Sequence, residues 1–296
     1  MLRRPRRAIA ILTAAPIAIA ALAGCAAGED PAGDGRIAVV TSTNVYGSIA
    51  SAIGGDRVAV ESIVDSIASD PHDYEASARD QLDVSRADLI VVNGGGYDAF
   101  MDLLIDATGT QAPVIVASEL AGDGDNEHVW FDVTGMGAVG QAIAASLADI
   151  DPAGDAEYRA GAEAFADRVA GLVEREAALA ARVDGAGVLM TEPLPAHLLT
   201  ATGFVDVTPA GFAEAIEEGS EVSVGLLDRV ITTITSGQVA LVVINEQTGG
   251  PETDAVRRAA DEAGVPVVSF TETIPEGLDW VRWMSANIDE IERALS

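Results

Sequence analysis

Apolar and polar positions along this chain follow two periods, one typical of buried strands and one typical of amphipathic helices. Short runs rich in Val and Ile predict strands at residues 36–42, 58–64, 88–92, 114–117, 187–191, 239–245 and 265–270. Segments with helical spacing predict helices at residues 45–53, 76–87, 97–107, 134–150, 196–202, 222–235, 252–263 and 278–295. This β-α-β alternation predicts parallel sheets that are flanked by helices.

The segment between the two series of strands has a different amino-acid composition. Asp151-Pro152 places a capping carboxylate before a proline at the first helical position, and residues 152–184 are rich in Ala, Glu and Arg. Gly161 and Gly171 are expected to weaken this helix locally. Its predicted length is about 50 Å, longer than one small lobe needs. We therefore expect an α/β fold of two lobes, each a mainly parallel sheet flanked by helices, joined by one long spanning helix.

These patterns divide the chain into five parts. An export signal at residues 1–24 combines four arginines, an apolar stretch at residues 8–21 and a small-residue cleavage site. Residues 25–35 are small and polar, which is typical of a flexible tether. The tether is followed by an N-terminal lobe at residues 36–151, the spanning helix at residues 152–185 and a C-terminal lobe at residues 186–296.

The only cysteine, Cys25, directly follows the predicted cleavage site. The run Leu22-Ala23-Gly24-Cys25 resembles the bacterial lipobox, which implies a lipid-modified N-terminal cysteine. The alternative is a free thiol after an ordinary signal, because a single exported cysteine forms no internal disulfide. We expect a protein that is anchored by lipid to the outer face of the cell membrane and does not span it.

The chain is strongly acidic, with 47 Asp and Glu residues, 17 basic residues and a formal net charge of −30. Four of the basic residues belong to the export signal, so its removal brings the net charge to −34. Such a surface repels nucleic acid and anionic substrates and attracts cations. We expect no nucleic-acid partner and a monomer. Trp280 and Trp283 lie at helical spacing and are predicted to be core residues.

Four side chains that can bind a metal follow predicted strands: His72, His128, Glu192 and Glu272. Open α/β sheets bind ligands beyond the carboxyl ends of their strands, so these side chains are placed to converge. His72 and His128 both lie in polar turns, at residues 69–75 and 127–132. Their pattern predicts a divalent metal held between the lobes, although each residue alone is also compatible with a solvated surface position.

The chain resembles the substrate-binding lipoproteins of bacterial zinc and manganese ABC importers over nearly all of its mature length. The family's Asp-Pro-His-x-Tyr-Glu turn is matched at residues 70–75, and its His-x-Trp-x-Asp turn at residues 128–132. Asp151-Pro152 and the Ala/Glu-rich helix also match. Glu192 occupies the position of the third ligand, and Glu272 that of the fourth, which is usually Asp.

The resemblance implies high-affinity capture of Zn²⁺ or Mn²⁺ and its delivery to an ABC permease, and no enzymatic activity. His72, His128, Glu192 and Glu272 would bind the transported ion. Tyr74, Trp130 and Asp132 are candidates for orienting the imidazoles. Two imidazoles with two carboxylates suit either ion, so the choice between zinc and manganese stays open.

Several alternatives remain. His197 lies five residues after Glu192 and would serve as third ligand if the turn containing Pro193 and Pro195 is rearranged. Residues 94–99 fit the G-x-G-x-x-A nucleotide fingerprint, but they follow the third predicted strand, not the first. The other functional class is a lipoprotein that binds an organic solute or acts as a surface adhesin. Such a protein would tolerate the loss of both histidines.

Overall fold

The structure is a computed structural model that describes residues 35–121 and 126–296, and the range Gly35–Ser296 forms one compact unit. The predicted export signal, Cys25 and all of the predicted tether except Gly35 lie outside the described residues. The acidic residues 122–125, which precede the second candidate histidine, also lie outside them.

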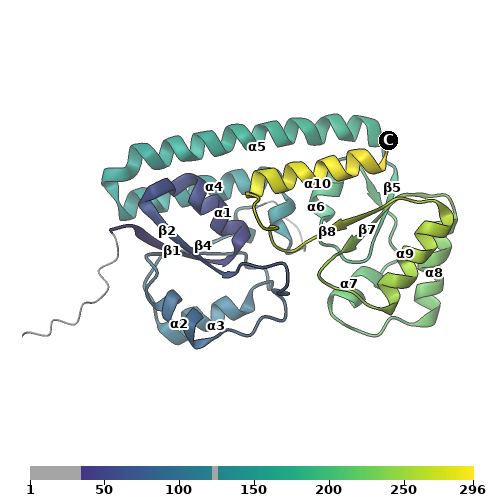
Figure 1. Ribbon diagram of the computed structural model, residues 1–296, viewed down its shortest axis with the longest axis horizontal. Coiled ribbons are helices and arrows are strands. Elements are labelled where there is room, and N and C mark those ends of the chain that lie inside the picture. Colours follow the sequence, from purple (N-terminus) through teal and green to yellow (C-terminus); the bar gives the residue numbers. More distant parts are fainter. Residues whose placement is uncertain (1–34, 122–125) are drawn as a thin grey trace, which may run out of the picture. The chain divides into compact units, whose positions relative to one another are not determined.

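The first lobe is built on a four-stranded parallel sheet in the order β2-β1-β3-β4. Its strands are β1 (Ile37–Thr43), β2 (Val58–Val64), β3 (Leu89–Val92) and β4 (Val114–Val116). Its helices are α1 (Asn44–Gly54), α2 (Ala78–Ser85), α3 (Ala99–Thr108) and α4 (Val133–Ile150). The helices cover both faces of the sheet, α1 and α4 one face and α2 and α3 the other (Figure 1). Burial on both faces explains the continuous apolar run of the central strand β3.

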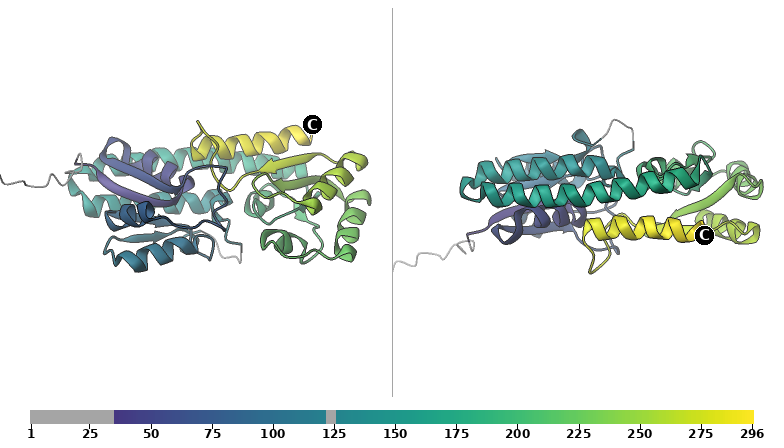
Figure 2. Two further views of the ribbon diagram at one scale, coloured as in Figure 1. Left: turned by 60° about the horizontal axis from the view of Figure 1, so that its bottom comes forward. Right: turned by 90° about the horizontal axis from the view of Figure 1, so that it is seen from above.

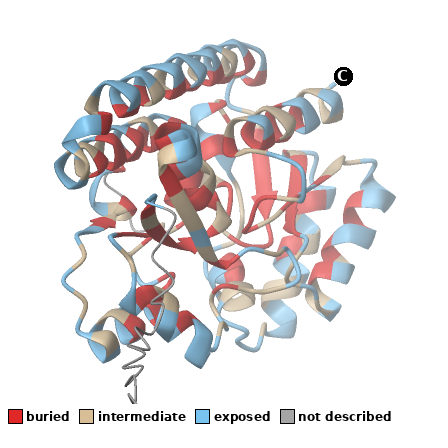
Figure 3. Ribbon diagram, turned by 60° about the vertical axis from the view of Figure 1, so that its left-hand side comes forward, coloured by how far each residue is buried: buried red, intermediate tan, exposed pale blue. Residues whose placement is uncertain are grey.

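The second lobe repeats the arrangement, with a parallel sheet in the order β6-β5-β7-β8. Its strands are β5 (Gly187–Met190), β6 (Val205–Asp206), β7 (Val239–Asn245) and β8 (Val267–Phe270). Its helices are α6 (Ala196–Ala201), α7 (Phe212–Glu217), α8 (Val224–Thr235), α9 (Pro251–Ala263) and α10 (Trp280–Ala294). The predicted two-lobed α/β fold is confirmed. Figure 3 shows that the strands carry many of the buried residues.

Strand β6 and helix α7 were absent from the predicted elements. Strand β6 has two residues and α7 has six, so neither is long enough to show a period in the sequence. Helix α7 begins after Gly211, whose φ of +80° is readily adopted only by glycine. This short helix carries Glu217, which lies at the candidate site described below.

The long helix α5 (Asp155–Val183) lies along both lobes, with α4 and α10 beside it (Figures 1 and 2). The three residues before it, Pro152–Gly154, form a turn of 3-10 helix, so the α-helix begins three residues later than predicted. Asp151 caps this turn through a hydrogen bond from the Ala153 amide. Arg175 of α5 donates to the Ser285 hydroxyl at 2.7 Å and thereby joins α5 to α10.

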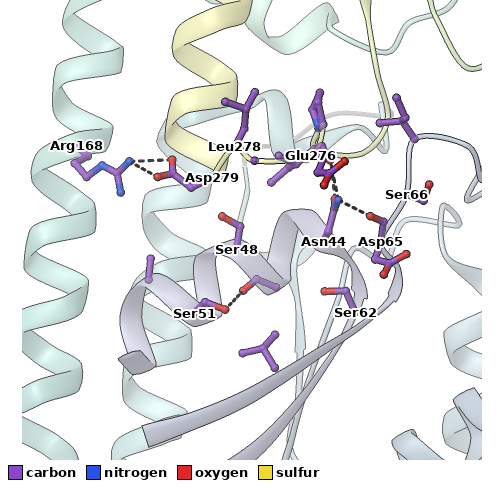
Figure 4. Close-up of a pocket in the computed structure, with 17 residues that line it drawn as sticks. Asn44, Ser48, Ser51, Ser62, Asp65, Ser66, Arg168, Glu276, Leu278 and Asp279 are labelled. Atoms are coloured by element: carbon purple, nitrogen blue, oxygen red, sulfur yellow. Dashed lines mark hydrogen bonds and ion pairs between the residues drawn. The ribbon is translucent and has the colours of Figure 1, made fainter. Parts of the chain in front are cut away.

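The two lobes share a continuous apolar core. Trp280 and Trp283 are 1% and 2% exposed, which confirms that both are core residues. The Trp280 indole packs against Phe165 of α5 and donates to the Trp130 carbonyl at 3.2 Å. Asn44, at the start of α1, donates to the Ile274 carbonyl and accepts from the Ile274 amide, both at 2.9 Å. Asn44 lines a cavity of about 920 Å³ at this joint (Figure 4).

Among residues 35–121 and 126–296, one helix, α4, is long and apolar enough to cross a membrane by length and composition. Its residues Met136, Val139 and Ile143 are fully buried in the same apolar core as Phe165 of α5. Packing inside the fold therefore accounts for its apolar composition.

Candidate metal centre

The four sequence-predicted ligands lie beyond the carboxyl ends of strands from both sheets. His72 follows β2 and His128 follows β4, whereas Glu192 follows β5 and Glu272 follows β8. The imidazole centroids of His72 and His128 lie 5.8 Å apart. Oε2 of Glu272 lies 3.8 Å from Nε2 of His128. The structure thus brings both histidines and one of the two glutamates together, and Glu192 adjoins them through a hydrogen-bond network.

A tight polar turn positions His72. The Asp70 carboxylate accepts a hydrogen bond from the His72 amide at 2.9 Å, and Gln247 of the second lobe donates to the Ser69 carbonyl at 2.9 Å. The His72 ring packs edge-on against Tyr97 at 4.9 Å. Its Nδ1 lies 3.4 Å from Glu127 Oε1, and its buried Nε2 has no hydrogen-bond partner among the described residues. Such a buried, unpaired nitrogen is a free ligand atom.

Asn126 determines the tautomer of His128. Its amide nitrogen donates to the Pro193 carbonyl at 2.8 Å, and since a carbonyl only accepts, the Asn126 orientation is defined. Oδ1 of Asn126 then accepts from both the backbone amide and Nδ1 of His128, at 2.9 and 2.8 Å. The proton of His128 is therefore on Nδ1, which leaves the lone pair on Nε2. Within the described chain, that fully buried Nε2 has no hydrogen-bond partner.

The buried surroundings keep His128 neutral. Burial, with the nearby His72 and His197, lowers its pKa well below 6.5. A neutral imidazole is the form that binds metal ions.

Glu192 and Glu272 share one amide group. The side-chain nitrogen of Asn245, the last residue of β7, donates to Glu192 Oε2 and Glu272 Oε1 at 2.8 Å each. Tyr97 donates to Glu272 at 3.1 Å, and the Thr248 hydroxyl donates to Glu192. Burial raises the pKa of both carboxyl groups, that of Glu272 well above its usual value because Glu192 is also close. A cation between the lobes would offset this repulsion.

Two further carboxylates at the site were not predicted. One ligand atom each from His72, Glu127, His128 and Glu217 lies within 4.8 Å of the others, a group that does not include Glu192 or Glu272. Oε1 of Glu217 lies 3.4 Å from His128 Nε2. Burial and the neighbouring Glu127 raise the pKa of Glu217 to about 7. Glu127 adjoins the His128 motif in sequence and could have been noticed, whereas nothing local distinguishes Glu217 from the other acidic residues around it.

Among the residues predicted to orient the imidazoles, Trp130 contacts His128, whereas Tyr74 is directed elsewhere. Tyr74 donates to Asp80 at 3.0 Å, not to an imidazole, because its ring turns toward Phe100. Trp130 packs edge-on against His128 at 5.1 Å, and Asp132 caps α4 by accepting from the Gly135 amide. Orientation of His128 by Asn126 was not foreseen.

The alternative third ligand, His197, points to a backbone group. Its Nε2 donates to the Asn126 carbonyl at 3.2 Å, and it is not part of the four-residue group. His197 is therefore placed to support the His128 loop.

The glycine-rich loop at residues 94–96 is folded on itself. The Asp98 carboxylate accepts from the amides of Asn93 and Gly94, which are the groups a nucleotide phosphate would need. The Asn93 side chain donates to the Glu127 carbonyl at 2.8 Å. The loop presents Tyr97 to both candidate histidines and to Glu272. This loop therefore supports the candidate metal centre.

The chain has two α/β lobes along one long helix, and imidazoles and carboxylates face each other between the two sheets. These features define a two-lobed protein that binds metal ions. The chain belongs to the family described as zinc-uptake complex component A, periplasmic, whose profile matches residues 39–294. This membership confirms the resemblance to metal-binding substrate-binding proteins of ABC importers.

Individual relatives agree with this assignment. The manganese-binding lipoprotein MntA of Halalkalibacterium halodurans is 27% identical over 291 residues, which cover 93% of this chain and 94% of that one. The crystal structure of ZnuA matches with a TM-score of 0.75 at 21% identity, covering 88% of this chain and 100% of that one. The periplasmic zinc-binding protein TroA from Treponema pallidum matches with a TM-score of 0.74 at 22% identity and the same coverage. These structures share the fold.

Proposed function

We propose that this protein captures Zn²⁺ or Mn²⁺ outside the cytoplasm and delivers it to the permease of an ABC importer. His72, His128, Glu192 and Glu272 would hold the ion. The observation that carries the proposal is the pair of buried Nε2 atoms on His72 and His128, which lack hydrogen-bond partners in the described part of the chain. Leaving two such atoms unpaired in a folded protein is costly, and an ion would satisfy both.

The chemistry of the donor set favours a divalent ion. Neutral imidazoles with two carboxylates balance a charge of +2. Zinc takes four such ligands with monodentate carboxylates, and manganese uses bidentate carboxylates and higher coordination. Intrinsic affinity favours zinc over manganese, so the metal delivered also depends on which ion is available.

Binding and release follow from the placement of the ligands on two lobes. The ion would replace protons on carboxyl groups whose pKa burial has raised, so capture releases protons. Because Glu192 and Glu272 come from the second sheet, a bound ion stabilises the joined arrangement of the lobes. A permease that displaces either set of ligands would weaken binding.

The remaining parts of the proposal concern location and assembly. Cys25 would carry the lipid that anchors the protein to the outer face of the membrane, and the chain would act as a monomer. The net charge of −34 after signal removal supports a cationic cargo. The relative MntA is itself named a lipoprotein.

Thermal melting of the full-length, metal-stripped protein tests the proposal. Hundredfold excess of Zn²⁺ or Mn²⁺ over its Kd is expected to raise the stability by about 2.7 kcal/mol and the Tm by about 5–10 °C. The shift should disappear in His72→Ala and persist in His197→Gln, which removes the alternative ligand. A folded protein that shows no shift with either ion would refute metal capture.

A further inference from the structure

We propose that Glu217, at the end of α7, is a direct ligand of the transported metal ion. This inference rests on the proposed function and adds a carboxylate from the second lobe that the family motifs do not identify. Its starting point is a close approach of two buried atoms, Glu217 Oε1 and His128 Nε2, which lie 3.4 Å apart. Neither atom has a hydrogen-bond partner within residues 35–121 and 126–296.

The two atoms are both electron-pair donors. His128 carries its proton on Nδ1, which is bonded to Asn126, so Nε2 has none to donate. An ionised carboxylate also only accepts. Two such atoms facing each other in a buried site repel unless a proton or a metal cation lies between them.

The distances suit a single ion. Ligand atoms on a tetrahedral zinc with bonds of about 2.0–2.1 Å lie about 3.3–3.4 Å apart. The 3.4 Å separation of Glu217 Oε1 from His128 Nε2 lies within this range. All four residues offer ligand atoms within 4.8 Å of each other.

The other carboxylates of the site are already engaged. Glu192 and Glu272 accept from Asn245, and they also accept from Thr248 and Tyr97 respectively. The Glu217 oxygen that faces His128 has no such bond to any residue that the structure describes. Among these three carboxylates of the second lobe, Glu217 is therefore the one with an oxygen that is free to bind an ion next to His128.

Packing explains why Glu217 points inward. Helix α7 is anchored by Phe212, which is fully buried in the core of the second lobe. The adjacent Glu214 and Glu218 are exposed to solvent. The side chain of Glu217 is 19% exposed, whereas Glu272 is fully buried. Glu217 thus lies on the solvent side of the site, where an arriving ion first meets the second lobe.

Binding of Co²⁺ and Zn²⁺ to the full-length protein at pH 8 tests this inference. Co²⁺ reports its ligands through its visible absorption. Glu217→Gln is expected to weaken binding of both ions by at least about tenfold and to change the Co²⁺ spectrum. Glu217→Asp keeps the charge and should have a smaller effect. The matched control, Glu218→Gln at the exposed residue directly after this helix, should alter neither affinity nor spectrum.

The outcomes separate this inference from the proposed function. Unchanged affinity and spectrum in folded Glu217→Gln, with binding abolished in His128→Ala, would overturn the role of Glu217 and leave metal capture standing. Weaker binding with an unchanged Co²⁺ spectrum would also overturn it, because Glu217 would then act through its charge alone. A parent protein that binds neither ion would overturn both.

Discussion

A Gly161→Ala variant is expected to be less stable than the parent protein by about 1–3 kcal/mol. Gly161 lies where α5 crosses the end of α1. An added Cβ would lie 2.9 and 3.0 Å from Cα and C of Ile53, and closer still to its carbonyl oxygen. These are backbone atoms, so no side chain can rotate away, and α5 would have to move off the first lobe.

Gly171→Ala, in the same helix, provides the control. Gly171 is exposed, and no described atom lies within 4 Å of an added Cβ. Alanine has the higher helix propensity, so this variant should be more stable by about 0.5–1 kcal/mol. Urea unfolding of the metal-free protein measures both values. Changes of the same sign would show that α5 does not approach α1 as closely as described.

A Glu176→Gln variant is expected to gain stability relative to the parent as the pH rises. The difference in unfolding free energy, variant minus parent, should be about 2–3 kcal/mol larger at pH 8 than at pH 5. Glu176 lies in the C-terminal third of α5 and is 5% exposed. Its Oε1 has no hydrogen-bond partner in the described ranges. Burial, and secondarily the charge of Asp132, raises its pKa from 4.5 to about 7.

The direction of this effect follows from proton binding. With its raised pKa, the folded state holds the Glu176 proton more tightly than the unfolded state does. Its contribution to stability is therefore complete below about pH 4.5 and is lost as the pH rises through about 7. Glutamine does not titrate and removes this loss.

Unfolding in urea from pH 5 to pH 8, in the presence of a chelator, measures the effect. Other buried carboxyl groups, such as Glu217 and Glu272, are present in both proteins and cancel in the comparison. The exposed Glu174 lies on the same helix, so Glu174→Gln is the matched control for the exchange of Glu for Gln. A parallel pH dependence for the parent and Glu176→Gln would contradict the prediction.

Much of the architecture followed from local patterns. Residues 58–64 and 239–245 were predicted as strands with the bounds that the structure has. The strand at residues 239–245 is almost entirely buried, and its nearly continuous apolar run reflects that environment in the sequence itself. The spanning helix was also predicted, apart from its first turn, because 29 residues contain many turns over which the helical period repeats.

The candidate site was predictable in part. His72 and His128 lie in short turns whose residue order is distinctive, and Glu192 and Glu272 could be located from the ends of strands. Glu217 could not, because it lies in an acidic stretch on a helix too short to show a period. Asn126 and Asn245 were missed as well, since only the folded chain reveals which atoms their amides join.

Order along the chain was therefore enough to establish the α/β alternation, the long helix and the polar turns that hold the two histidines. Those features depend on near neighbours in sequence, which share one strand, helix or turn. The packing of distant segments decided the rest. It turned Glu217 toward His128 while its neighbours stayed in solvent, and it made Gly161 indispensable while Gly171 is not. Neither difference depends on residue type, because both arise from what another segment places opposite the residue.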